Sequence, residues 1–143
     1  EVSNFARGKE YQCRHNLAYW RGRDWWGIGP GAHRHREGYR SWNLKHPSRY
    51  AAALAQDRLP VDDFEQVSDA DRLLERLMLE MRIREGFPAE SNTLTSTKEA
   101  REVLERHVGA GRLDADAWDS GIVRLSDAGR LLADAITRDV AAL

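Results

Sequence analysis

The residues best suited to chemistry are crowded into one part of the chain. Residues 15–46 hold four of the five histidines, and residues 20–42 hold four of the five tryptophans. A neutral imidazole can ligate a metal ion, and its second ring nitrogen is then held by a neighbouring group. The N-terminal third of the sequence is therefore the first place to look for a ligand site.

His15 has the richest surroundings of these histidines. It lies between Arg14 and Asn16 and precedes Tyr19 and Trp20 in the stretch RHNLAYW. An imidazole in this setting suits haem iron, with the aromatic rings against the porphyrin and the arginine on its carboxylates. A structural histidine bonded to the backbone would have the same appearance, because no partner stands at metal-ligand spacing. The residues alone favour the structural interpretation.

Other features give weaker or negative signals. His33, His35 and His46 lack the spacing of a zinc hydrolase, and Cys13 is the only cysteine. No disulfide and no cysteine-ligated zinc or iron–sulfur site can form within this chain. The stretch GIGPGA at residues 27–32 resembles a glycine-rich ligand loop, whose backbone N–H groups approach an anion. A tight structural turn would have the same composition. The arginines that follow fit a solvated face as well as a ligand site: Arg34, Arg36 and Arg40.

Charge is distributed unevenly along the chain. Residues 1–49 carry ten Lys or Arg and four Asp or Glu, whereas residues 50–143 carry twelve and nineteen. No apolar run approaches the roughly 18 residues that span a bilayer, and no signal-peptide pattern is present. We therefore expect a cytoplasmic protein without an integral membrane segment. The chain opens at Glu1 in the strand-like stretch EVSNF, which predicts a fragment of a longer protein.

Helical periodicity appears only in the back half of the chain. We expect short strands and glycine-rich loops, and no sustained helix, between Glu10 and Pro47. A short helix should follow Pro47 and end before Pro60. Ser68 should begin a longer helix, because Asp71 stands three residues on at the capping-box spacing. Five apolar residues form the buried stripe expected of that helix: Leu73, Leu74, Leu77, Met78 and Met81.

The C-terminal part predicts a helix, a hairpin and another helix. Ser96 should cap a helix that ends at Gly109, and Ser126 should cap the last helix. Residues 112–118 and 122–125 should pair as a β-hairpin. This order is typical of a winged-helix domain, but the helix over residues 97–108 balances three basic against three acidic residues, so we expect no nucleic-acid partner. The last helix should face inward with Leu131, Leu132, Ala135, Ile136 and Val140.

Four motifs carry a family resemblance: EVSNFAR, CRHNLAYW, GIGPGAH and SWNLKHP, in this order. Together they resemble the C-terminal part of the HemW-like proteins, radical S-adenosylmethionine proteins related to oxygen-independent coproporphyrinogen III oxidase. The stretches LERLMLEMRIREG and IVRLSDAGRLLAD are similar to the helical domain of that family. The resemblance covers this whole chain but only about the last third of such a protein.

The resemblance implies an α+β fold in two parts. Residues 1–48 would be the end of a radical-SAM partial barrel, made of strands and glycine-rich loops, with Glu1–Phe5 as a late strand. Residues 49–143 would be a mostly helical, winged-helix-like C-terminal domain. The family binds a [4Fe–4S] cluster through a CxxxCxxC motif, which this sequence lacks. The fragment alone is therefore expected to be inactive, and no catalytic residue is assigned.

The resemblance also implies two groups of binding residues. The HNxxYW pattern is associated with haem binding, which makes His15 the haem ligand, with Asn16, Tyr19 and Trp20 supporting it. The GIGPGAH loop would lie at the barrel mouth and contact S-adenosylmethionine. Arg34 stands where the family usually has serine, which weakens that second assignment. The cofactor-binding residues of the loop would be Gly29, Gly31, Ala32 and His33.

The function implied is that of a haem chaperone, which binds haem and delivers it to haem-accepting proteins, with a homodimer as a possible assembly. One alternative is an oxygen-independent coproporphyrinogen III oxidase, using S-adenosylmethionine and a [4Fe–4S] cluster held by the parent protein. A second alternative is a winged-helix module that docks a partner protein.

Overall fold

The computed structural model describes residues 4–143, which form two compact units. One unit comprises the chain up to Gly22 together with Leu73–Leu143, and the other comprises Arg23–Arg72. The domain boundary expected at residue 48 stays a prediction. No helix within residues 4–143 has the length and apolar character needed to cross a bilayer.

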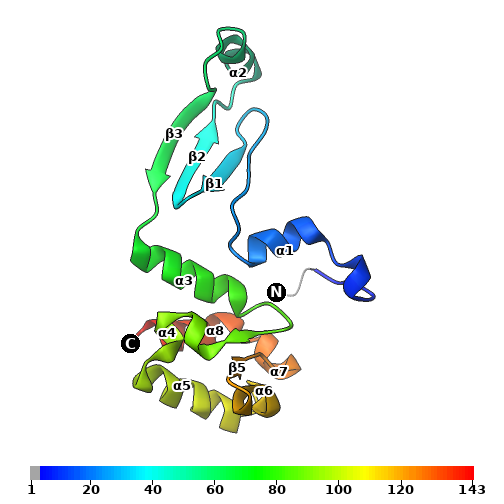
Figure 1. Cartoon of the computed structure of the whole chain (residues 1–143), viewed down its shortest axis with the longest axis vertical. Coiled ribbons are helices and arrows are strands. Elements are labelled where there is room, and N and C mark those ends of the chain that lie inside the picture. Colours follow the sequence, from blue (N-terminus) through cyan, green and yellow to red (C-terminus); the bar gives the residue numbers. More distant parts are fainter. Residues whose placement is uncertain (1–3) are drawn as a thin grey trace. The chain divides into compact units, whose positions relative to one another are not determined.

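Arg23–Arg72 is built on a three-stranded antiparallel sheet in the order β1-β2-β3 (Figure 1). Its strands are β1 (His33–Arg36), β2 (Tyr39–Asn43) and β3 (Val61–Gln66). Glu37 and Gly38 connect β1 to β2 and both have positive φ, 52° and 81°. A two-residue connection of this kind matches the right-handed twist of the strands it joins.

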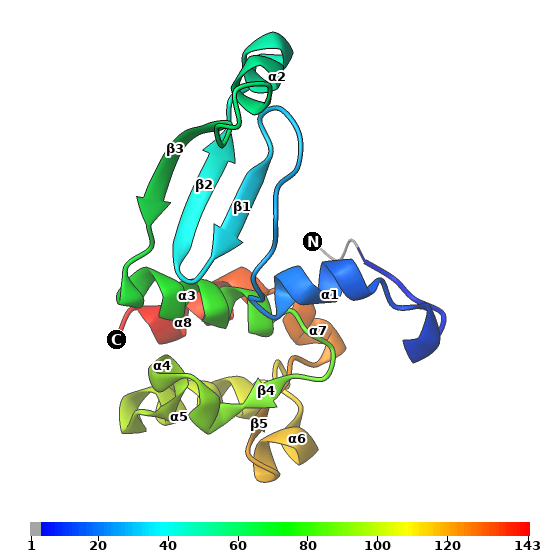
Figure 2. The same ribbon diagram turned by 45° about the horizontal axis from the view of Figure 1, so that its top comes forward.

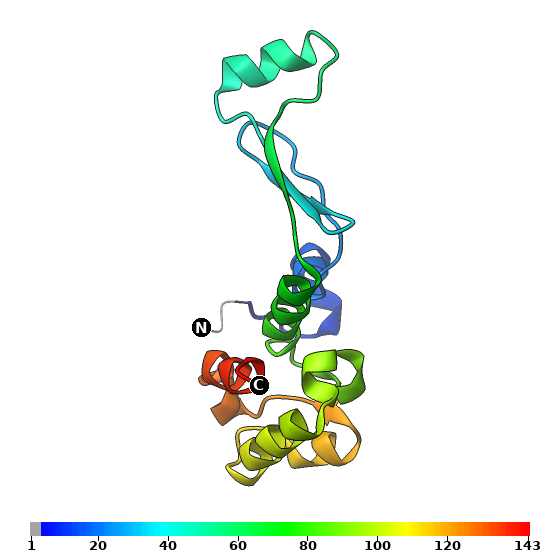
Figure 3. The ribbon, with the colours of Figure 1, turned by 90° about the vertical axis from the view of Figure 1, so that its left-hand side faces the viewer.

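Helix α2 (Pro47–Leu54) connects β2 to β3 and lies beyond the end of the sheet (Figure 3). Proline in its first turn removes an N–H that would have no helical partner, and the fixed φ of the ring suits the helix. The short helix expected after Pro47 is thereby confirmed. Neither face of the sheet is covered by a helix of Arg23–Arg72 (Figures 1 and 3).

The other unit is mainly helical (Figure 2). Its larger part packs around one apolar core, to which most of its helices contribute. Strand β4 (Phe87–Pro88) pairs antiparallel with β5 (Ile122–Val123). The helices are α1 (Arg14–Trp20), α3 (Asp69–Glu80), α4 (Thr93–Ser96), α5 (Lys98–Gly109), α6 (Ala115–Asp119), α7 (Asp127–Arg130) and α8 (Ala133–Ala141), of which α3 begins in the sheet unit.

The N-terminal part contains one helix that the sequence did not predict. Helix α1 corrects the expectation of only short strands and loops, with no sustained helical period, between Glu10 and Pro47. It has seven residues and no side-chain cap, so neither a periodic apolar stripe nor a cap marked it in the sequence. The strand expected over Glu1–Phe5 falls mostly on residues 1–3, which lie outside the described residues. Phe5 is not in a strand and is exposed.

The predicted caps were partly right. Ser68 Oγ accepts a hydrogen bond from the Asp71 amide at 3.1 Å and lies 2.6 Å from its carboxylate, which confirms the first cap. Ser126 Oγ accepts from the Gly129 amide at 3.0 Å, which confirms the last one. Ser96 is wrong as a cap, because it ends α4 and Thr97 caps α5 instead.

The apolar stripes were also only partly right. Leu77 and Met81 are buried in the core, whereas Met78 is 40% exposed. In the last segment Ile136 and Val140 are buried, but Leu131 is 81% exposed. The chain leaves helical geometry between α7 and α8, and that break turns Leu131 away from the face on which the stripe was counted.

The predicted hairpin of residues 112–118 and 122–125 is not formed. Residues of its first strand form α6, because Asp114 caps that helix by accepting from the Ala117 amide at 2.9 Å. The second strand pairs with Phe87–Pro88 instead, and one isolated bridge between Leu113 and Leu125 joins the two segments. The residues expected to form a wing therefore take a different structure, and the winged-helix detail stays a prediction.

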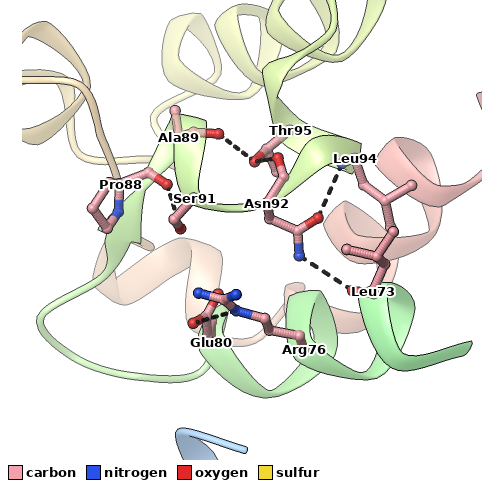
Figure 4. A network of polar contacts seen from close by, with 9 residues as sticks. All are labelled: Leu73, Arg76, Glu80, Pro88, Ala89, Ser91, Asn92, Leu94 and Thr95. Carbon is pink, nitrogen blue, oxygen red and sulfur yellow. Dashed lines mark hydrogen bonds and ion pairs between the residues drawn. The ribbon is translucent and has the colours of Figure 1, made fainter. Parts of the chain in front are cut away.

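A buried polar network joins α3 to the segment before α5 (Figure 4). The fully buried Asn92 accepts from the Leu94 amide at 3.0 Å and donates to the Leu73 carbonyl at 3.2 Å. Thr95 Oγ1 lies 2.6 Å from the Ala89 carbonyl oxygen. Buried polar groups of this kind need their partners, so the network holds one arrangement of these segments.

Candidate functional site

Helix α1 brings together all four residues of the HNxxYW pattern. His15 and Tyr19 are one turn apart, and their rings meet edge to face with centroids 4.7 Å apart and planes at 77°. Asn16 and Trp20 are likewise one turn apart and lie on the adjoining face, because residues four apart project to the same side of a helix. The Asn16 side-chain amide donates to Asn4 Oδ1 at 2.8 Å, which holds the preceding segment against the helix.

The His15 side chain is available for a ligand. It is exposed, and within residues 4–143 neither of its ring nitrogens has a hydrogen-bond partner. A histidine held by the backbone at a strand end, the ordinary interpretation of this residue, would be neither helical nor unbonded. Contact with the edge of Tyr19 orients the imidazole without occupying its nitrogens. The arrangement can therefore supply one neutral nitrogen donor to a metal centre.

The glycine-rich loop before β1 has most of its backbone amides engaged. The amide of Gly29 donates to Tyr50 Oη at 3.2 Å, and that of Gly31 donates to the Leu44 carbonyl at 3.0 Å. The amide of Ala32 donates to the Gly29 carbonyl at 3.3 Å. A loop with these bonds is a structured turn, and it offers a ligand its side chains rather than a cradle of free N–H groups.

The carbonyls of the same loop are held by Asn43. Its side-chain amide donates to the carbonyls of Gly27 and Gly29 at 3.2 and 3.0 Å, and Asn43 is itself buried. A Cβ on Gly27 would lie 1.9 Å from the His33 carbonyl oxygen, so only glycine fits there. His33 is exposed at the start of β1, with its ring centroid 5.7 Å from that of Trp42. Among the predicted loop residues Gly29, Gly31, Ala32 and His33, only His33 has a polar side chain, and it is exposed.

The two groups of predicted residues belong to different compact units. His15, with its helix, lies in the unit that contains the helical core, and Gly29–His33 lies in Arg23–Arg72. Neither unit fits an iron–sulfur cluster. Cys13 is a single exposed thiol, and residues 4–143 contain no group of three His, Cys, Asp or Glu side chains placed to hold a metal ion.

Comparison with known proteins places the chain. No family model matches it. It is 45% identical over 140 residues to "Heme chaperone HemW" of Mycobacterium tuberculosis, covering 96% of this chain and 33% of that protein. It is 31% identical over 86 residues to the Bacillus subtilis protein of the same name, covering 60% of this chain and 22% of that one. The chain belongs to the HemW-like proteins.

The HemW-like chain spans about a third of the length of the M. tuberculosis relative it matches. Among solved structures it is similar to the Escherichia coli coproporphyrinogen III oxidase HemN, described as a radical SAM enzyme. The TM-score is 0.52 at 15% identity, covering 83% of this chain and 28% of that one. At this identity the likeness concerns the fold, which is mixed α and β and HemN-like.

Sequence patterns did not single out His107 of the HemW-like chain. It is 5% exposed on α5, with Nε2 lying 3.1 Å from Asp139 Oδ2 of α8 and Nδ1 lying 3.3 Å from Arg112 Nη1. Because arginine only donates, Nδ1 accepts and Nε2 donates to the carboxylate. His107 is therefore a structural link between helices. Its position three residues past the apolar pair Val103–Leu104, on the buried face of α5, was the available signal.

The sequence also gave little weight to the arginines of β1. Arg34 and Arg36 stand two residues apart in the strand, so both project from the same face of the sheet. An open hollow of about 370 Å³ lies on that face. It is lined by Trp26, Arg34, Arg36, Glu37, Tyr39, Ser41, Val61 and Phe64.

Proposed function

We propose that this chain is the haem-handling part of a haem chaperone, which binds haem and passes it to haem-accepting proteins. The observation that carries the proposal is His15, exposed and without a hydrogen-bond partner among residues 4–143, in a chain that is 45% identical over 96% of its length to a protein named as a heme chaperone. A chaperone has to hold haem and then release it, and one ligand on an exposed helix suits both requirements.

In this proposal His15 donates a neutral ring nitrogen to the haem iron. The edge of Tyr19, 4.7 Å away between centroids, limits rotation of the imidazole and so favours one direction of approach. Trp20 supplies apolar surface beside the macrocycle, and Asn16 fixes the segment ahead of the helix through Asn4. Because His15 is the single iron ligand proposed, transfer to an acceptor requires breaking one iron–nitrogen bond together with the apolar contact to Trp20.

The parent protein would also use S-adenosylmethionine and a [4Fe–4S] cluster, whose cysteine ligands are not in this sequence. Residues 1–48 would complete a radical-SAM partial barrel, and residues 49–143 would form the winged-helix-like domain. His33 is the best candidate for an S-adenosylmethionine contact because its side chain is exposed, with Gly29, Gly31 and Ala32 shaping the loop. A cytoplasmic location and a homodimer stay predictions for the parent.

The test is a haem titration of the full-length protein that contains this chain. We expect His15→Ala to lose or shift the Soret band and to weaken haem binding more than about tenfold, since even groups that only support a metal ligand contribute that much. His46→Ala is the matched control, because His46 is also an exposed histidine but bonds to Ser48 Oγ at 2.9 Å. An unchanged spectrum and affinity in His15→Ala would remove the ligand assignment.

The oxidase alternative has less support. Its basis is the likeness to E. coli HemN, which at 15% identity concerns the fold alone. Anaerobic consumption of coproporphyrinogen III by the reconstituted full-length protein would establish it.

A further inference from the structure

One face of the three-stranded sheet gathers aromatic rings and arginines from all three strands. The register places Arg34 opposite Ser41, and Ser41 opposite Phe64, so these residues share a face, as do Arg36 and Tyr39. Trp26 lines the same hollow, and its neighbour Trp25 forms an isolated β-bridge with His35 of β1. We call this surface, formed by Trp26, Arg34, Arg36, Tyr39 and Phe64, the Trp26 face.

The rings of the Trp26 face are unusually exposed. Trp26 and Phe64 are 62% and 65% exposed, and Tyr39 is 46% exposed. No helix of Arg23–Arg72 lies over either face of the sheet (Figure 3). A contiguous group of exposed large rings beside a hollow of about 370 Å³ is characteristic of a binding surface. Apolar rings are stabilised when a ligand removes them from water.

The two arginines lie between Trp26 and the rings of β2 and β3, over the Trp26 ring. Their guanidinium carbons lie 5.6 Å (Arg34) and 5.4 Å (Arg36) from the ring centroid of Trp26. Arg36 pairs with Glu37 at 3.0 Å, which offsets its charge. Arg34 uses Nε to donate to Ser41 Oγ, and across residues 4–143 no carboxylate pairs with it. Arg34 thus presents a positive charge that is already oriented, as recognition of a carboxylate requires.

We propose that the Trp26 face binds a planar, carboxylate-bearing tetrapyrrole. Its rings would pack against the macrocycle, and Arg34, assisted by Arg36, would meet a carboxylate at the edge. The inference rests on the proposed function, since haem is such a ligand, but it involves neither the iron nor His15. It therefore extends to the metal-free porphyrin.

A nucleic acid is the less suitable occupant of the same face. Aromatic and arginine side chains on a sheet can also stack on unpaired bases. A polyanionic backbone, however, needs an excess of positive charge. Residues 23–72 contain eight Lys or Arg and eight Asp or Glu, and β3 itself carries three carboxylates. A ligand with one or two carboxylates needs no more than the arginines available here.

The experiment titrates the full-length protein with metal-free protoporphyrin IX and with its dimethyl ester, followed by porphyrin fluorescence. The double variant Arg34→Gln with Arg36→Gln should bind the diacid roughly tenfold or more weakly, because a charge-assisted hydrogen bond contributes about that factor. Its binding of the ester should not change, which also shows that the sheet is intact. Glu37→Gln should bind the diacid more tightly, since it frees Arg36.

One variant and the metal-free ligand serve as controls. Arg40 lies between Tyr39 and Ser41 on β2, projects to the opposite face and pairs with Glu65 at 3.1 Å. Arg40→Gln removes one positive charge from the opposite face and should leave the binding of both porphyrins unaffected. The metal-free porphyrin has no iron for His15 to ligate, so failure of the haem-ligand proposal and failure of the Trp26-face proposal can be told apart.

Several results would overturn the proposal. These are no binding of either porphyrin to the unaltered protein, equal losses for the diacid and the ester, or equal losses in Arg40→Gln. Displacement of the porphyrin by a single-stranded oligonucleotide would assign the face to nucleic acid instead. Acrylamide quenching of tryptophan fluorescence in the ligand-free protein, compared with that of Trp26→Phe, measures whether Trp26 is accessible. A Trp26 side chain that is shielded by another segment or a second copy would also overturn the proposal.

Discussion

Replacing Asn92 with alanine should destabilise the helical unit by about 3 kcal/mol. The fully buried side chain caps α4 through the Leu94 amide at 3.0 Å, and loss of such a cap costs about 1 kcal/mol. Its second hydrogen bond, to the Leu73 carbonyl at 3.2 Å, contributes about another 1 kcal/mol. The void left where the amide stood adds about 1 kcal/mol more.

Urea-induced unfolding followed by circular dichroism measures this loss. Ser91→Ala is the matched control, because the neighbouring hydroxyl donates to the Pro88 carbonyl at 2.7 Å at a less buried position. That control should lose less than about 1 kcal/mol. If Asn92→Ala loses no more than Ser91→Ala, the buried network does not hold α3 to this segment and the reasoning fails.

Asn92→Asp separates shape from hydrogen bonding at the same position. The variant keeps the acceptor for Leu94 but, once ionised, sets a second oxygen against the Leu73 carbonyl. Burial raises the pKa of the introduced carboxyl in the folded state. Below the unfolded pKa of about 3.9 both states are protonated, so the variant should approach the wild type. As pH rises past that value it should lose stability relative to the wild type, and a penalty that does not vary with pH would contradict this account.

Two further predictions concern stability. A Cβ on Gly129 would lie 1.8 Å from a backbone oxygen of a neighbouring segment, whereas one on Gly109 meets nothing within 4 Å. Gly129→Ala should therefore lose about 2–4 kcal/mol in thermal denaturation, and Gly109→Ala should be neutral or stabilising. The pKa of Asp114 is lowered, first by the Ala117 amide and then by the hydrogen bond from Arg124, so its stabilisation is present above the ordinary pKa and is lost as pH falls through the folded one. Asp114→Asn keeps the cap but should make urea unfolding less sensitive to acid, and an equal acid sensitivity in both proteins would refute this.

A sequence motif predicted which residues form the candidate haem site, but not their local structure. The pattern at residues 15–20 named four residues, and the structure brings them together on one short helix. That His15 is exposed, with no hydrogen-bond partner in the part of the chain that the structure describes, could not be predicted, because a seven-residue helix without a side-chain cap has no local signature. The alternation in HRHR could have predicted that Arg34 and Arg36 share a face of a strand. The aromatic residues of the Trp26 face could not be predicted in the same way, because they come from segments up to 38 residues apart.

The sequence by itself determined the features that depend on neighbouring residues. It specified the capped start of α3 at Ser68, the proline-led start of α2 and the family resemblance, because a cap, a fixed φ and a motif each involve only a few consecutive residues. Tertiary structure alone decided that Ile122–Val123 pairs with Phe87–Pro88 and not with residues 112–118. Strand pairing depends on which distant segment the packed core brings alongside, and no local pattern contains that information.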